Sequence, residues 1–122
     1  AEDGIRDVVL SRGLGDVIRV EGHTDDVPMG NKLKYANNWE LSVARATNVG
    51  VFMIEKNGYD PDLISITGHA DTRPRISYTS ETGQRKLGKV LKEARKANRR
   101  VDLIFARPAA SEQIRRFFPE QE

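Results

Sequence analysis

The sequence predicts an α/β domain of the α+β sandwich kind, in which helices pack on a single mixed β-sheet. Short apolar segments that end in glycine alternate with longer segments of helical periodicity. This alternation favours helices packed on one sheet. The length of 122 residues suits one domain, and 38% hydrophobic with 31% charged residues is typical of a globular protein. We therefore expect a single domain over residues 1–122, with its core at 17–106 and a tail at 107–122 that carries a short helix.

The first predicted elements are a helix over residues 5–12 and a strand over 17–21. Apolar side chains recur at helical spacing in the first segment, and Gly13 follows it. The second segment reads Val-Ile-Arg-Val-Glu and stops at Gly22. A polar loop at 23–37 follows, so the chain is expected to leave the sheet there.

A long helix is predicted from Asn37 or Asn38 to about Asn57. Both asparagines are good N-caps, and the acidic residue three positions after Asn37 makes a capping-box-like start. Gly58 is the natural stop. Because residues 49–54 are apolar nearly all round, this helix is expected to lie against the core.

The second half predicts a strand over 63–67, a helix over 84–97, a strand over 100–105 and a tail helix beginning near Ser111. The 84–97 helix has an apolar stripe at core spacing, so the row of basic residues on its other side is expected to form a solvated outer face. This row consists of Arg85, Lys89, Lys92, Lys96 and Arg99. These stripe residues are Leu87, Val90, Leu91 and Ala94. The direction of the last strand stays open.

Two segments repeat the same element, a strand that ends in Gly-His-x-Asp. They are residues 20–25 and 66–71, and each glycine is expected where the backbone turns sharply. One interpretation is a metal-dependent hydrolase, since imidazole and carboxylate suit zinc or iron. Its ligands would be His23, Asp25, His69 and Asp71. The interpretation we favour is structural: both imidazoles hydrogen-bond loop backbone, and no metal or cofactor is bound.

Composition excludes several other classes. The chain has no cysteine, so it holds neither a disulfide nor a thiolate metal site. No apolar run is long enough to span a bilayer, and no signal peptide precedes Ala1, so we expect a mature or excised domain. A net charge of +2 does not demand a nucleic-acid partner. No aromatic residues interleave with the basic helix, so no nucleic acid is expected.

Four motifs in order resemble the OmpA-like peptidoglycan-binding family. They are VEGHTD, NxxLSxxRAxxV, GxxDTxP and NRRV, at residues 20–25, 38–49, 68–74 and 98–101. Asp26-Val27-Pro28, the segment Asn-Trp-Glu-Leu-Ser at 38–42 and the long loop after Asp25 are similar to the MotB-like flagellar stator branch. The family domain opens with a strand before its first helix. Because Ala1 precedes the first predicted helix closely, we expect that strand to be absent or truncated.

The resemblance implies a ligand: the stem peptide of peptidoglycan, recognised at meso-diaminopimelate. The free end of this residue presents an ammonium beside a carboxylate. Asp25 is suited to accept from the ammonium, and the planar fork of Arg45 can take the carboxylate. An internal salt bridge between these two side chains is the competing interpretation. Further ligand contacts are expected from Thr24, Asn38, Arg100 and the backbone amides of Asp26 and Val27. Asn38 is first a cap, and Arg100 equally fits a flanking role.

The resemblance implies that the parent protein, which contains this domain, is a membrane-anchored, MotB-like stator subunit. This subunit is expected to be homodimeric and to work beside an ion-channel subunit. Its domain is expected in the periplasm, with the parent anchored in the inner membrane. An OmpA/Pal-type anchor of the outer membrane is the alternative. In each case the domain is expected to bind and not to catalyse, because no arrangement of nucleophile and base is evident.

Overall fold

The computed structural model describes residues 16–30 and 34–106. The helix predicted over 5–12 and the tail helix predicted after Ser111 lie outside these residues. No helix in the described ranges is both long and apolar enough to cross a membrane.

Within the described residues, the centre is a mixed sheet of three strands: β1 (Val17–His23), β2 (Ile64–Gly68) and β3 (Arg100–Ala106). The strand order is β2-β1-β3. β1 runs parallel to β2 and antiparallel to β3. This confirms the single mixed sheet predicted from the sequence and settles the direction of the last strand.

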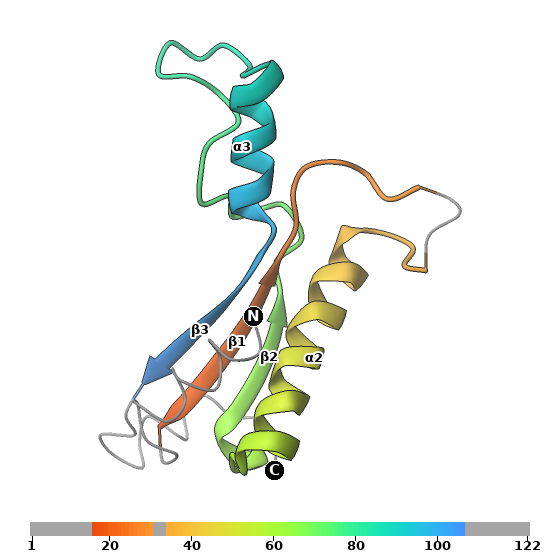
Figure 1. Ribbon diagram of the computed structural model, residues 1–122, viewed down its shortest axis with the longest axis vertical. Helices are drawn as coiled ribbons and strands as arrows, with labels where there is room; N and C mark the ends of the chain where they lie inside the picture. Colours follow the sequence, from red (N-terminus) through yellow and green to blue (C-terminus); the bar gives the residue numbers. More distant parts are fainter. Residues whose placement is uncertain (1–15, 31–33, 107–122) are drawn as a thin grey trace, which may run out of the picture.

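One face of the sheet is covered by helix α2 (Asn38–Asn57), as Figure 1 shows. The core between them contains Ile18 and Val20 of β1 with Ala46 and Met53 of α2, all fully buried. Successive side chains of a strand point to opposite faces. Arg19, Glu21 and His23, which alternate with these core residues along β1, therefore face away from α2.

The ends of α2 follow from its flanking residues. Asn37 is the N-cap, and its Oδ1 accepts a hydrogen bond of 3.0 Å from the backbone N–H of Glu40. Gly58 closes the helix with φ +68°, a left-handed conformation that glycine adopts without steric cost. A 3₁₀ turn, η1 (Pro61–Leu63), then leads into β2. Of the two asparagines predicted as caps, Asn37 performs this role and leaves Asn38 free for another.

Gly22 and Gly68 allow α2 to approach the strand ends closely. A Cβ atom added at Gly22 would lie 1.9 Å from the carbonyl oxygen of Ser42, and one at Gly68 would lie 2.4 Å from Cγ2 of Val43. Neither glycine has a positive φ. The expectation that they make sharp turns was therefore wrong: they are glycines because the helix leaves no room for a side chain.

Helix α3 (Gly88–Asn98) begins later than predicted and does not bury its apolar stripe. The preceding residues form a turn with a bridge between Thr79 and Arg85, and Gly88 itself has φ +57°. The helix projects beyond the carboxyl ends of β1 and β2 (Figure 1), so Leu87 stays 75% and Val90 59% exposed. Spacing alone therefore wrongly predicted that the whole stripe packs on the core; only Ala94 is buried.

Candidate functional site

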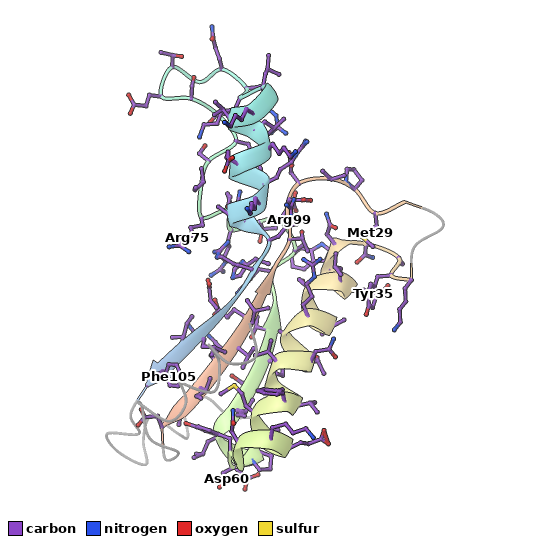
Figure 2. All side chains as sticks on the ribbon, viewed as in Figure 1. Met29, Tyr35, Asp60, Arg75, Arg99 and Phe105 are labelled. Atoms are coloured by element: carbon purple, nitrogen blue, oxygen red, sulfur yellow. The ribbon has the colours of Figure 1, made fainter. Side chains whose placement is uncertain are left out.

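A pocket of about 190 Å³ opens where β1 ends and α2 begins. Its wall combines three charged side chains with an apolar rim. The charged residues are Asp25, Arg45 and Arg99, and the rim is formed by Val27, Pro28, Met29 and Leu41. The loop after β1, the first turns of α2 and the residue after α3 thus meet at one place. In Figure 2, Arg99 lies at the base of α3 and Met29 lies on the loop leading toward α2.

Asp25 is held in a defined position within this pocket. Its Oδ1 accepts a hydrogen bond of 2.9 Å from the backbone N–H of Val27. Its Oδ2 accepts one of 2.8 Å from Nη1 of Arg99. The carboxylate therefore has a fixed direction and a cation already beside it.

Arg45 enters the pocket from the second turn of α2 and is half-buried. Asp25 and Arg45 thus line one pocket, as expected for two side chains predicted to contact the same ligand. The predicted alternative of an internal salt bridge between them was wrong, because the ion pair of Asp25 is with Arg99. Within the described part of the chain, no ion pair or hydrogen bond involves the guanidinium of Arg45, so it can accept a ligand carboxylate.

Asn38 braces the rim of the pocket from the first residue of α2. Its Nδ2 donates to the carbonyl oxygens of Val27 at 3.1 Å and Asp25 at 3.4 Å. Thr24 is buried, donates from Oγ1 to the carbonyl of Asp25, and pairs its backbone N–H with the carbonyl of Ala70. Both residues therefore shape the loop that carries Asp25.

Arg99 is the charged residue of the described pocket lining that sequence reasoning did not select as a ligand contact. It stood in the row of basic residues assigned to a solvated face and in the NRRV motif. Only the neighbouring Arg100 was selected. The structure places Arg100 away from the pocket lining, where Nε donates to both carboxylate oxygens of Asp102 at 3.1 and 3.2 Å. Of its two interpretations, the flanking role fits these contacts.

Asp26 faces away from the pocket and fastens α3 and its preceding turn. Arg95 donates from Nε to Oδ1 at 2.8 Å, and Arg85 contacts Oδ2. Burial alone would raise the pKa of Asp26, but the hydrogen bonds from Arg95 and then Arg85 outweigh it and lower the pKa. The side chain of Asp26 therefore serves the tertiary structure, and the ligand contact predicted for this residue, through its backbone amide, stays a prediction.

Asn98, the first residue of the NRRV motif, is fully buried and organises the 70–76 loop. Its Oδ1 accepts from the backbone N–H groups of Arg75 and Ile76 at 2.7 and 2.9 Å, and its Nδ2 donates to the carbonyl of Ile76 at 2.9 Å. An amide is required there because it offers both an acceptor and a donor.

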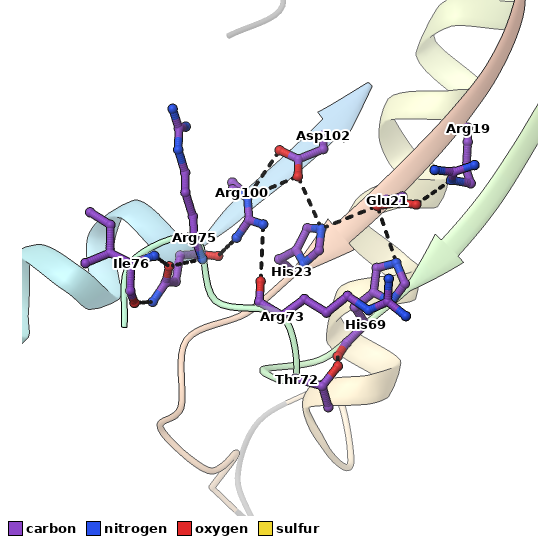
Figure 3. Close-up of polar contacts among 11 residues, drawn as sticks. Arg19, Glu21, His23, His69, Thr72, Arg73, Arg75, Ile76, Arg100 and Asp102 are labelled. Atoms are coloured by element: carbon purple, nitrogen blue, oxygen red, sulfur yellow. Dashed lines mark hydrogen bonds and ion pairs between the residues drawn. The ribbon is translucent and has the colours of Figure 1, made fainter. Parts of the chain in front are cut away.

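The two histidines of the repeated motif lie together on the face of the sheet opposite α2 (Figure 3). Their rings stack with centroids 5.0 Å apart, and Glu21 lies beside both. Burial, followed by the charge of Arg100, lowers the pKa of His23. The expected hydrogen bonds to loop backbone are absent for both nitrogens of His23 and for Nε2 of His69 among the described residues. The alternative ligand set was wrong too, because neither Asp25 nor Asp71 joins the histidines, and Glu21 does.

Opposed fixed charges around a small pocket can hold a ligand that carries both a cation and an anion. The fold and the pocket thus define a binding domain. The chain belongs to the OmpA family, because the model of that family matches residues 8–88, more than half of its length.

The chain is also similar to individual proteins and to solved structures. Motility protein B of Bacillus subtilis is 32% identical over 95 residues, which are 78% of this chain and 32% of that protein. The cell wall anchor of the T6SS from Pseudomonas aeruginosa is 30% identical with a TM-score of 0.64, covering 86% of this chain and 64% of that one. The periplasmic domain of Helicobacter pylori MotB shares the fold, with a TM-score of 0.66 at 24% identity, covering 99% and 68%. The chain spans about a third of the length of the curated relative.

Proposed function

We propose that this domain binds the stem peptide of peptidoglycan non-covalently and anchors its parent protein to the cell wall. The observation that carries the proposal is that Asp25 and Arg45 line one pocket. Family membership and the likeness to a cell wall anchor support the same ligand.

The geometry suits the zwitterionic end of meso-diaminopimelate. Arg45 can take the ligand carboxylate through two parallel hydrogen bonds, while the ammonium approaches Asp25. The apolar rim of Val27, Met29 and Leu41 offers a surface for the aliphatic chain between the two ends of that residue. Since charge-assisted hydrogen bonds contribute roughly 1.5–3 kcal/mol each, the loss of one should weaken binding at least about tenfold.

Arg99 gives the pocket a second cation. Arg99 forms an ion pair with Asp25, so an incoming ammonium must share the carboxylate with Arg99 or displace it. The released guanidinium then remains within the pocket, where it can add to the field that attracts the ligand carboxylate. The site therefore exchanges one ion pair for another and does not bury an unpaired charge.

For the parent we propose a MotB-like stator subunit that is anchored in the inner membrane, carries this domain in the periplasm as a homodimer, and works with an ion-channel subunit. Support comes from the identity with Motility protein B and the shared fold of a periplasmic MotB domain. An outer-membrane anchor is the alternative. The gene's upstream coding sequence discriminates them: a transmembrane helix supports the stator, and a lipoprotein signal or β-barrel the alternative.

Co-sedimentation with purified peptidoglycan sacculi tests the binding function. We expect the wild-type domain to pellet with sacculi, and Asp25→Asn and Arg45→Leu to remain in the supernatant. Asp71→Asn and Arg75→Leu are matched controls, since both positions are exposed and outside the pocket lining. Retention of both pocket variants on sacculi would refute the proposal.

A further inference from the structure

The polar cluster on the face of the sheet opposite α2 is separate from the pocket. Glu21 and His23 stand two residues apart on β1 and point to the same side. His69 follows β2, whose last residue, Gly68, pairs with Gly22 in parallel register. Figure 3 shows the three side chains converging between the two strands.

We propose that Glu21, His23 and His69 form a binding site for a divalent first-row transition ion, with Zn²⁺ as the best fit. Imidazole nitrogen and carboxylate oxygen are the donor atoms that zinc accepts in proteins. Each of the three residues offers one such atom, and these atoms lie within 4.8 Å of one another.

The spacing of the donor atoms agrees with a tetrahedral ion. Ligands about 2.0–2.1 Å from Zn²⁺ lie about 3.3 Å from each other in tetrahedral geometry. Oε1 of Glu21 is 3.4 Å from Nε2 of His69 and 3.9 Å from Nε2 of His23. An ion between Glu21 and His69 therefore needs little adjustment of these two side chains, and His23 has to move closer to them, since the three donor atoms lie within 4.8 Å of one another.

A second observation is that three of the four imidazole nitrogens are buried and have no hydrogen-bond partner among the described residues. The side chain of His23 is only 3% exposed, yet neither of its nitrogens has a hydrogen-bond partner in the described part of the chain. The same holds for Nε2 of His69. Buried polar atoms are nearly always partnered, and a bound ion is one recognised explanation for those that are not. Here the unpartnered Nε2 atoms are the ones directed at the shared carboxylate oxygen.

The surrounding charges hold the cluster in place. Arg19 contacts Oε2 of Glu21, which leaves Oε1 for the imidazoles. Oδ2 of Asp102 lies 3.4 Å from Nε2 of His23, and Arg100 donates to both carboxylate oxygens of Asp102. Asp102 is thereby placed beside His23, where it can accept a hydrogen bond from a water in the fourth position.

Such an ion would join the ends of β1 and β2 immediately before Thr24 and Asp25. Its role would be structural, because it cross-links two neighbouring strands beneath the loop that enters the pocket. The inference does not depend on peptidoglycan binding, and its test uses no wall ligand.

Titration of the untagged, chelator-treated full chain with Co²⁺ and then Zn²⁺ tests the proposal. We expect one equivalent of Co²⁺ to produce the visible absorption of a tetrahedral ion and Zn²⁺ to abolish it by displacement. Histidine side-chain NMR of the wild type should show the ring signals of both His23 and His69 shifting with one equivalent of Zn²⁺.

Variants locate the site. His69→Gln and Glu21→Gln should weaken Zn²⁺ binding at least about tenfold, by loss of one ligand, whereas Asp71→Asn, the exposed acid of the same loop, should bind as the wild type does. Circular dichroism checks that each variant is folded. Ring signals of the wild type that do not respond to Zn²⁺ would overturn the proposal whatever the variants do. Equal Zn²⁺ affinity in folded His69→Gln and Glu21→Gln would overturn it as well.

Discussion

Arg99 donates a hydrogen bond of 2.8 Å to Asp25, which joins residues 74 positions apart in the sequence. Asp26, the next residue, binds Arg95 and Arg85 in the same region. Two consecutive acidic residues thus connect the loop after β1 to α3 and its preceding turn. The first of these ion pairs lies in the pocket, and the other two hold the projecting helix.

Arg99→Leu should weaken the binding of a diaminopimelate-containing muropeptide about fivefold. The Arg99–Asp25 ion pair is partly exposed and therefore contributes about 1 kcal/mol or less to the position of Asp25. Isothermal titration calorimetry with the muropeptide measures the change. Arg45→Leu should lose considerably more. An Arg99→Leu affinity equal to that of the wild type would show that the second cation is irrelevant to the pocket.

Asn38→Ala and Asn37→Ala should separate binding from helix stability. Loss of the N-cap in Asn37→Ala should lower the free energy of unfolding by about 0.5–2 kcal/mol and leave muropeptide affinity unchanged. Asn38→Ala removes the two hydrogen bonds to the carbonyls of Asp25 and Val27, so its affinity should fall several-fold. Urea denaturation and calorimetry on both variants give the comparison. The opposite pattern would mean that the roles are assigned to the wrong asparagines.

Gly22→Ala should destabilise the domain by about 1–3 kcal/mol, because the new methyl group collides with the backbone of α2 and forces it away from β1. Gly30→Ala is the matched control, since nothing lies within 4 Å of its added Cβ and the change should stay within about 0.5 kcal/mol. Urea denaturation measures both. Similar midpoints for the two variants would contradict the close approach of helix and strand.

Asp26→Asn should loosen α3 and lower the free energy of unfolding by about 1 kcal/mol, since both of its arginine partners are partly exposed. Because the folded pKa of Asp26 lies below its ordinary value of 3.8, the ion pairs stabilise the fold above about pH 4. That contribution is lost as the pH falls through the folded pKa. The stability difference between wild type and variant should accordingly shrink in acid, as measured by urea denaturation from pH 7 to pH 2. If the stability difference between wild type and variant is unchanged at pH 2, the ion pairs of Asp26 are not its cause.

Much of the fold was predictable because its signals are local. The segment Val-Ile-Arg-Val-Glu before Gly22 predicted β1, and Asn37 and Gly58 predicted both ends of α2 within one residue. The late start of α3 was not predictable from its apolar stripe, because Gly88 adopts a left-handed conformation and the stripe meets no sheet. Periodicity shows which residues of a helix share a face, but not whether another element covers that face.

The candidate site was likewise predictable only in part. Asp25 and Arg45 were selected through motifs in consecutive elements, and their shared pocket is a short-range result of β1 leading into α2. Arg99 was missed because a row of basic residues on a helix gives no sign of which member has a distant acidic partner. Likewise, Asp26 and Asp25 are chemically identical neighbours, and only the position of α3 separates a structural carboxylate from one in the pocket.

By itself, the sequence determined the strands, the capped helix α2 and the chemical character of the pocket, since these depend on residues close together in the chain. Tertiary structure decided which arginine pairs with which acid, why Gly22 and Gly68 carry no side chain, and that His23 and His69 meet Glu21. Each of these results depends on segments that are distant in sequence, and contact between them is set by the register of β1, β2 and β3 and by the packing of α2.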